Sequence, residues 1–326
     1  MKTSEKILEY LKRNDQVTGN EFIDYLGITG RAVRKQLKSL LEAGLVTKIG
    51  IPPKVYYSLA PQKVQVAADN VGDLNQDIVD NIAKEFFYIS PRGTIHEGWE
   101  GFTYWCREGK LDIRKMALQY KKASDKYDSY KKDGFISGIS KIKATFDDVA
   151  LDELFYIDFY SMEVFGKTRL GQLLLFAKQS QDRKMINNIA DIIEPSVLKL
   201  MEQYKVDGVG FIPPTVKREL QLMKQIQNRL NLSTKTLSIT KIKTPVAVPQ
   251  KTLNKIEDRI INAKDTMNLD DTSIYNNILL IDDAVGSGAT LNEMAKKIRQ
   301  KGICKGKIVG LAITGSFKGF DVISEV

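Results

Sequence analysis

Apolar residues recur at helical spacing in three stretches of the first 45 residues. The third stretch starts at Gly30, and basic side chains lie opposite its apolar positions, so we predict a helix with one buried and one basic face. Two short segments, 45–50 and 55–59, flank a Pro52-Pro53 turn and predict two paired strands. The apolar positions of the three predicted helices are Ile7, Leu8 and Leu11, then Phe22, Ile23 and Leu26, then Val33, Leu37, Leu40 and Leu41.

This order of elements, three helices and a two-stranded wing over residues 3–60, resembles the winged helix-turn-helix family. In that family the second helix of the motif enters the DNA major groove and the wing touches the backbone. Residues 1–63 carry 11 Lys+Arg against 6 Asp+Glu, a net charge of +5 that suits a phosphate backbone. A role in docking another protein stays open, because winged helices also serve that purpose. By position, the resemblance implies DNA binding by Thr29, Arg31, Arg34, Lys35, Lys38, Lys48 and Lys54.

In the carboxy-terminal region, apolar residues follow one another in continuous runs and do not recur at helical spacing alone. Residues 278–281 are all apolar, as in a strand that is buried on both faces of a parallel sheet. Thr290 and Glu293 then match a capping box, a helical apolar pattern follows, and a second apolar run covers 308–313. We therefore predict a strand–helix–strand unit of an α/β domain.

Two acids and a glycine-rich turn lie between the predicted strand and the predicted helix. Gly286 and Gly288 let the backbone fold closely around an anion, whose charge would be met by free N–H groups at a helix N-terminus. Asp282 and Asp283 would repel a phosphate, so we assign them to sugar hydroxyls, with or without Mg²⁺ nearby. A phosphate on one side and a diol on the other predict a ribose 5-phosphate site.

Residues 278–290 resemble the signature of the type I phosphoribosyltransferases, which is an apolar strand and two acids followed by Thr-Thr-Gly-x-Thr. That family binds phosphoribosyl pyrophosphate (PRPP) with Mg²⁺, and its two acids contact the ribose hydroxyls. The resemblance therefore implies catalytic roles for Asp282 and Asp283. This chain departs from the signature at Gly286, where threonine is common, which removes one hydroxyl contact to the phosphate and leaves the amides.

Three upstream segments are similar to the ComF-type branch of this family: residues 159–178, residues 207–218, and the stretch with Gln250, Arg259 and Asn262. In the wider family, the proline-containing loop in the second of these segments contacts pyrophosphate. The chain departs from the branch at residues 219–223, and it begins with a winged helix where the branch often has a zinc ribbon. Together the resemblances imply PRPP binding by Gly286, Ser287, Gly288, Ala289, Thr290, Pro213, Pro214, Thr215, Lys217, Arg218 and Lys178.

The densest positive charge lies in residues 211–264, which hold 11 Lys+Arg against 3 Asp+Glu, a net of +8. The middle of this region, 234–249, mixes Thr, Ser, Lys and β-branched residues with two prolines, and this favours a strand followed by a loop. In the family a flexible flap covers the cleft, and basic residues neutralise the departing pyrophosphate. Lys241, Lys243 and Lys251 are candidates for such a flap, and an ordinary surface loop stays open for each of them.

Composition excludes several classes of protein. The 326 residues carry a net charge of +9 and are enough for two or three domains. Cys106, Cys304 and His96 are the only cysteines and the only histidine, which excludes a disulfide framework, a multi-cysteine zinc ribbon and a histidine cluster. We expect no protein-built metal centre. No apolar run approaches the roughly 20 residues of a membrane span, and we expect a cytoplasmic protein.

These observations predict an α/β fold with three regions. Residues 1–63 form a winged helix-turn-helix DNA-binding domain, residues 64–154 a mainly helical connecting domain, and residues 155–326 a phosphoribosyltransferase-like parallel sheet flanked by helices. The leading hypothesis is a DNA-binding transcriptional regulator that senses PRPP or a nucleotide and has no membrane partner. In a homodimer, the ligand would change the spacing of two DNA-binding heads. An active phosphoribosyltransferase of nucleobase salvage stays open as the alternative.

Overall fold

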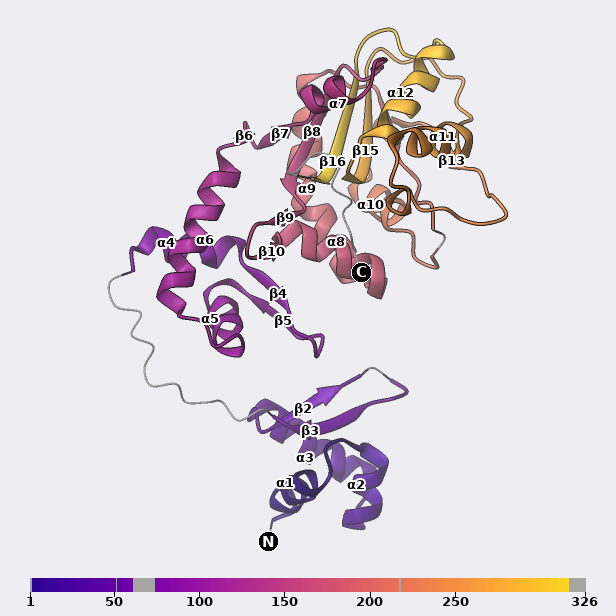
Figure 1. The fold of residues 1–326 in the computed structure, drawn as a ribbon. Helices are drawn as coiled ribbons and strands as arrows, with labels where there is room; N and C mark the ends of the chain where they lie inside the picture. Colours follow the sequence, from indigo (N-terminus) through magenta and orange to yellow (C-terminus); the bar gives the residue numbers. More distant parts are fainter. Residues whose placement is uncertain (1, 51, 61–73, 217, 317–326) are drawn as a thin grey trace. The chain divides into compact units, whose positions relative to one another are not determined.

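The computed structural model describes residues 2–50, 52–60, 74–216 and 218–316. The chain divides into two compact units, residues 1–70 and 71–326, which are coloured along the sequence in Figure 1. The domain boundary that we predicted at residue 63 lies outside the described residues.

The first unit contains the three predicted helices and the two-stranded wing, with one short additional strand. Residues at the predicted apolar positions form its core, in which Ile7, Phe22 and Leu37 are almost completely buried. Thr18 and Glu21 form a reciprocal capping box at the start of the second helix, and that helix ends at Gly27, whose φ of 63° suits a glycine. The elements are α1 (Thr3–Arg13), β1 (Val17–Thr18), α2 (Gly19–Leu26), α3 (Gly30–Glu42), β2 (Val46–Ile49) and β3 (Tyr56–Leu59), and the strands pair antiparallel in the order β1-β3-β2.

A seven-stranded sheet organises the second unit. The strands from β12 to β8 run parallel, whereas the two short strands β7 and β6 add an antiparallel edge. Those two edge strands come from the region that we predicted as a helical connection. In spatial order the strands are β12 (Lys235–Thr236), β11 (Gly208–Phe211), β15 (Ile278–Val285), β16 (Ile308–Gly315), β8 (Glu153–Phe159), β7 (Phe135–Ser137) and β6 (Lys131–Lys132).

Helices cover both faces of this sheet, which explains why its central strands are apolar throughout. Leu279 and Ile281 of β15 pack on one face with the helices α8, α9 and α10, and Ile278 and Leu280 pack on the other with α7, α11 and α12. Figure 1 shows α12 beside β15 and β16. The helices are α7 (Ile139–Thr145), α8 (Arg169–Ser180), α9 (Arg183–Gln203), α10 (Leu222–Leu230), α11 (Ile256–Thr266) and α12 (Ala289–Gln300).

Among the described residues, the remaining elements form an aromatic cluster, three two-stranded sheets and one 3₁₀ turn. Phe86, Phe102 and Tyr120 pack edge to face, with Trp105 tilted against Phe86, so the aromatic stretch 97–106 is a packing face. The elements are α4 (Gln76–Glu85), β4 (Phe87–Ile89), β5 (Ile95–Glu97), α5 (Gly98–Glu108), α6 (Ile113–Asp128), β9 (Ser161–Met162), β10 (Gly166–Lys167), β13 (Ile239–Lys241), β14 (Met267–Leu269) and the 3₁₀ turn η1 (Gln250–Thr252). A mixed α/β fold with an N-terminal winged helix, a mainly helical middle region and a mostly parallel sheet flanked by helices confirms the predicted fold class.

Candidate functional site

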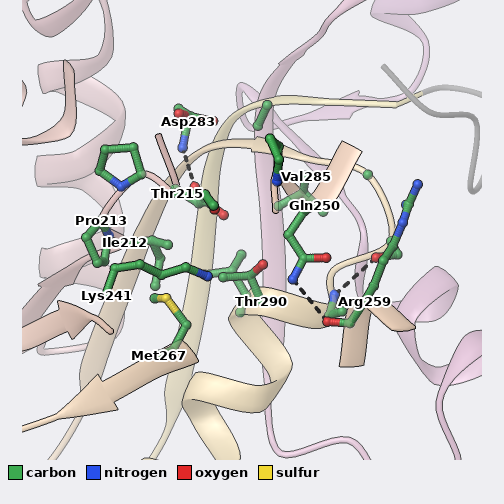
Figure 2. Close-up of a pocket in the computed structure, with 18 of the residues that line it drawn as sticks. Ile212, Pro213, Thr215, Lys241, Gln250, Arg259, Met267, Asp283, Val285 and Thr290 are labelled. Atoms are coloured by element: carbon green, nitrogen blue, oxygen red, sulfur yellow. Dashed lines mark hydrogen bonds between the residues drawn. The ribbon is translucent and has the colours of Figure 1, made fainter. Parts of the chain in front are cut away.

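A cleft of about 250 Å³ opens at the carboxyl ends of β11 and β15. Ligands of open α/β sheets bind at this edge, because the loops that follow parallel strands meet there. Figure 2 shows the cleft with Asp283, Thr290, Pro213 and Lys241 around it. Lys217 lies outside the described residues. Every other residue that we predicted for the ribose-phosphate site lines the cleft: Lys178, Pro213, Pro214, Thr215, Arg218, Asp282, Asp283, Gly286, Ser287, Gly288, Ala289 and Thr290.

The glycine-rich turn leads directly into the N-terminus of α12. Gly288 has a φ of 85°, and a Cβ atom there would lie 2.6 Å from Cδ1 of Ile142, so both backbone conformation and space require glycine. The Ser287 hydroxyl accepts a bond of 3.4 Å from the N–H of Ala289. The first N–H groups of a helix have no partners within that helix, so this turn presents donors to an anion.

The capping box that we predicted from Thr290 and Glu293 is wrong. The helix starts at Ala289, with Gly288 in the capping position, so Thr290 already lies in the first turn. The side chain of Glu293 pairs instead with the ammonium group of Lys296 at 2.9 Å. Thr290 is therefore not needed as a cap, and its side chain lines the cleft.

The two acids lie on opposite faces of β15, because successive side chains of a strand alternate. Asp283 is 3.1 Å from the ammonium nitrogen of Lys178, which lies in the last turn of α8. Asp282 accepts a bond of 2.8 Å from the backbone N–H of Asp283, and Lys241 of β13 is near enough to stabilise its charge. Burial and the charge of Asp283 raise the pKa of Asp282 from 3.8 to about 8. Near neutral pH, Asp282 is therefore largely protonated and can donate a hydrogen bond as well as accept one.

A polar network of Lys241, Gln250, Arg259 and Asn262 borders the same cleft. The side-chain amide of Gln250 donates to the carbonyl oxygen of Arg259 at 3.0 Å (Figure 2). It also donates to the side-chain oxygen of Asn262 at 3.3 Å. Lys241 donates to the same Asn262 oxygen at 3.5 Å, and burial lowers the pKa of Lys241. Gln250 thus contacts both Arg259 and Asn262, the two residues predicted together with it, and Gln250 and Arg259 line the cleft.

The flap candidates do not all reach the cleft. Lys241 lines it, whereas Lys243 is exposed and is not among the lining residues. The side chain of Lys251 lies outside the described residues. Residues 239–241 form β13, paired antiparallel with β14, and residues 242–249 form the loop that follows. Movement of this loop stays a prediction.

Tyr160 and Met267 also line the cleft, although we did not predict either of them from the sequence. Tyr160 directly follows the buried strand β8, and residues that follow parallel strands are the ones to inspect for ligand contacts. The position of Tyr160 after a predicted strand could therefore have identified it as a cleft residue. Met267 starts β14, and nothing in its local pattern indicates the cleft.

The predicted DNA-binding residues lie on α3 and on the wing. The Thr29 hydroxyl caps α3 by accepting from the N–H of Ala32 at 3.4 Å, so it has a structural use. Lys38 is 3.8 Å from Glu42, which is a weak exposed pair. The basic side chains that are exposed are Arg31, Arg34, Lys35 and Lys38 on α3, Lys48 on β2, and Lys54 just before β3.

Comparisons with known proteins give a family match and similarities to solved structures. A search of curated proteins found no match. Among solved structures, the chain is similar to a hypoxanthine phosphoribosyltransferase from Staphylococcus aureus, with 13% sequence identity and a TM-score of 0.25, over 44% of this chain and 70% of that chain. None of the helices in the described part of the chain has the length and apolar character needed to cross a bilayer. Residues 3–55 match the family described as HTH domain, so the first unit carries a helix-turn-helix domain of the kind that binds DNA.

Proposed function

We propose that this protein is a DNA-binding transcriptional regulator whose second unit binds PRPP or a nucleotide. The observation that supports it is the presence, in one chain, of a helix-turn-helix domain and of a separate cleft that combines a glycine-rich anion turn with two acids. A DNA-binding domain joined to a small-molecule site is the arrangement of a ligand-controlled regulator, because two sites on one chain can be coupled.

The cleft is suited to a ligand that has several negative charges and a diol. Its described lining holds four basic side chains, those of Lys178, Arg218, Lys241 and Arg259, against Asp282 and Asp283. We assign the 5′-phosphate to the N-terminus of α12, the ribose hydroxyls to the two acids, and the pyrophosphate to the basic residues and the loop after β11. Protonated Asp282 and ionised Asp283 together would offer both a donor and an acceptor to the ribose diol.

Magnesium belongs to this proposal only as part of the ligand. The side chains do not fit a dedicated magnesium site, because Asp283 is paired with Lys178 and Asp282 is largely protonated near neutral pH. Magnesium prefers carboxylate, phosphate and water oxygens. We therefore expect the ion to enter with PRPP, held by the oxygens of the ligand and by water.

Phosphoribosyl transfer to a nucleobase is the second candidate function. Lys178, Arg218 and Lys241 line the same cleft as the two acids, so positive charge is available to neutralise a departing pyrophosphate. Release of pyrophosphate from PRPP in the presence of a panel of purine and pyrimidine bases tests this function. Silence across the panel, together with measurable binding of PRPP, would leave the regulator as the function.

The DNA-binding part is tested by titrating fluorescent genomic fragments at 50 to 200 mM salt, with and without PRPP. We expect salt-dependent binding that PRPP changes several-fold, and a loss of affinity in the double variant Arg34→Ala with Lys38→Ala. Lys12→Ala, an exposed charge on α1, is the matched control and should bind DNA normally. No specific complex under any of these conditions, or binding without salt dependence, would contradict the proposal and favour a protein-docking role.

A further inference from the structure

Arg259 carries a positive charge in the protein interior, and none of the acids that the structure describes is paired with it. The residue is only 6% exposed, and its Nε donates to the carbonyl oxygen of Leu253 at 2.8 Å. In the described part of the chain no carboxylate forms an ion pair with it, and burial lowers the pKa of its guanidinium. A buried ion without a counter-ion is unfavourable, so such a residue is normally paired with an acid, a ligand or a metal-bound anion.

The guanidinium group of Arg259 lies next to Gly286, in the glycine-rich turn that precedes α12. Nη1 of Arg259 is 3.7 Å from the position that a Cβ atom on Gly286 would occupy. A threonine at that position would extend about 1.5 Å beyond this Cβ and would compete with the guanidinium for the same space. Gly286 is also the residue at which the chain departs from the Thr-Thr-Gly-x-Thr signature. The missing hydroxyl and the buried cation therefore occur side by side.

We propose that Arg259 binds the phosphate group held by residues 286–290 and supplies the contact that threonine makes in the signature. The planar guanidinium offers two parallel N–H donors to phosphate oxygens. Phosphate binding also balances the buried charge, so an anion stabilises the folded second unit. This inference rests on the proposed function only in placing a sugar phosphate in the cleft.

The test compares the binding of ribose 5-phosphate and of inorganic phosphate to the full chain and to Arg259→Met, by calorimetry and by thermal unfolding with added ligand. Methionine keeps much of the length of the side chain and removes the charge. We expect binding to weaken about 10- to 100-fold, as for the loss of a charge-assisted pair of hydrogen bonds. Without ligand, Arg259→Met should be at least as stable as the natural chain, because the unpaired charge is gone.

Two further variants separate a binding role from a structural one. Arg229→Met removes an exposed arginine of α10 that pairs with Asp191 at 2.8 Å, and it should leave phosphate binding unchanged. Adding Gly286→Thr to Arg259→Met should recover at least 3-fold of the lost affinity, because the threonine hydroxyl then enters the space left by the guanidinium. Gly286, unlike Gly288, does not have a positive φ, so threonine is compatible with the backbone there.

Each outcome decides the question. Equal affinity of the natural chain and of Arg259→Met for ribose 5-phosphate overturns the role of Arg259 and leaves the proposed function standing. Failure of the natural chain to bind any phosphate-bearing ligand overturns both. If Arg259→Met does not fold, Arg259→Lys takes its place. Lysine keeps the charge and lacks the planar pair of donors, so we expect a 3- to 10-fold weakening, and unchanged affinity would again overturn the assignment.

Discussion

Replacing Asp282 by asparagine should make the ligand-free protein more stable, even though the residue lies in the candidate site. Burial and Asp283 raise the pKa of Asp282 from 3.8 to about 8, which means that the folded state resists its ionisation. One pKa unit corresponds to about 1.4 kcal/mol, so a shift of this size sets a ceiling near 6 kcal/mol. Asparagine has no charge to bury, so we expect Asp282→Asn to gain several kcal/mol at pH 8, with this ceiling as the upper limit of the gain.

The dependence on pH identifies the cause of this gain. Between about pH 4 and pH 8 the folded state keeps a proton on Asp282 that the unfolded state releases, so the free energy of unfolding falls as the pH rises through this window. Asparagine does not titrate. The advantage of Asp282→Asn should therefore be near zero at pH 4, grow up to pH 8, and stay constant above it.

Urea unfolding followed by tryptophan fluorescence is a suitable assay. Both tryptophans, Trp99 and Trp105, belong to the second unit, so the signal reports on the unit that contains the cleft. Asp207 offers a matched control at the opposite end of the same sheet. Desolvation would raise its pKa, but the N–H groups of Asn276 and Asn277 outweigh that effect and lower it.

The control should respond with the opposite sign. Asp207→Asn loses hydrogen bonds that the ionised carboxylate accepts, so it should destabilise the protein at pH 7 by about 1 to 2 kcal/mol, and the loss should shrink as the pH falls through 4. A stability gain of Asp282→Asn that is the same at every pH, or no gain at pH 8, would refute the electrostatic reasoning.

Three further predictions concern single side chains. Tyr160→Phe and Tyr156→Phe should each raise the free energy of unfolding by about 1 kcal/mol, because both hydroxyls are buried without a hydrogen-bond partner among the described residues. Since Tyr160 lines the cleft, Tyr160→Phe alone should also change the nucleotide affinity measured by calorimetry. Val164→Gly should stabilise the protein by about 1 kcal/mol in urea unfolding, since its φ of 70° is strained for a β-branched residue, and Lys110→Gly at φ 52° should gain less. Asp283→Asn should weaken PRPP binding about 10-fold, and unchanged calorimetric affinity would show that the ribose site is misplaced.

Features that depend only on residues adjacent in the chain could be predicted from the sequence. The apolar run 278–281 and the glycine-rich turn were enough to predict a buried strand, a turn and a helix. The predicted capping box at Thr290 is absent because a contact between distant parts of the chain decides where α12 begins. Gly288 packs against Ile142 of α7 and occupies the capping position, so α12 starts at Ala289. The edge strands β6 and β7 have only two and three residues, too few to show a period of two.

The parts of the candidate site that the sequence did not predict depend on residues brought together by packing. Arg259 and Gly286 are 27 positions apart, and their contact follows from how α11 lies beside the turn after β15. Tyr160 reaches the cleft because β8 is added to the sheet beside β16. Residue spacing within a single segment cannot predict these contacts between segments that are distant in the chain.

The ion pair between Lys178 and Asp283 has a consequence for how the protein would respond to its ligand. In the ligand-free cleft, the carboxylate of Asp283 and the ammonium group of Lys178 compensate each other's charge, so a ligand that draws either group away loses part of this ion pair. The free energy of that loss is subtracted from binding, and every 1.4 kcal/mol subtracted raises the half-saturating concentration about tenfold. Under the proposed regulatory function, the pair would therefore set a response threshold, below which trace amounts of the ligand have little effect.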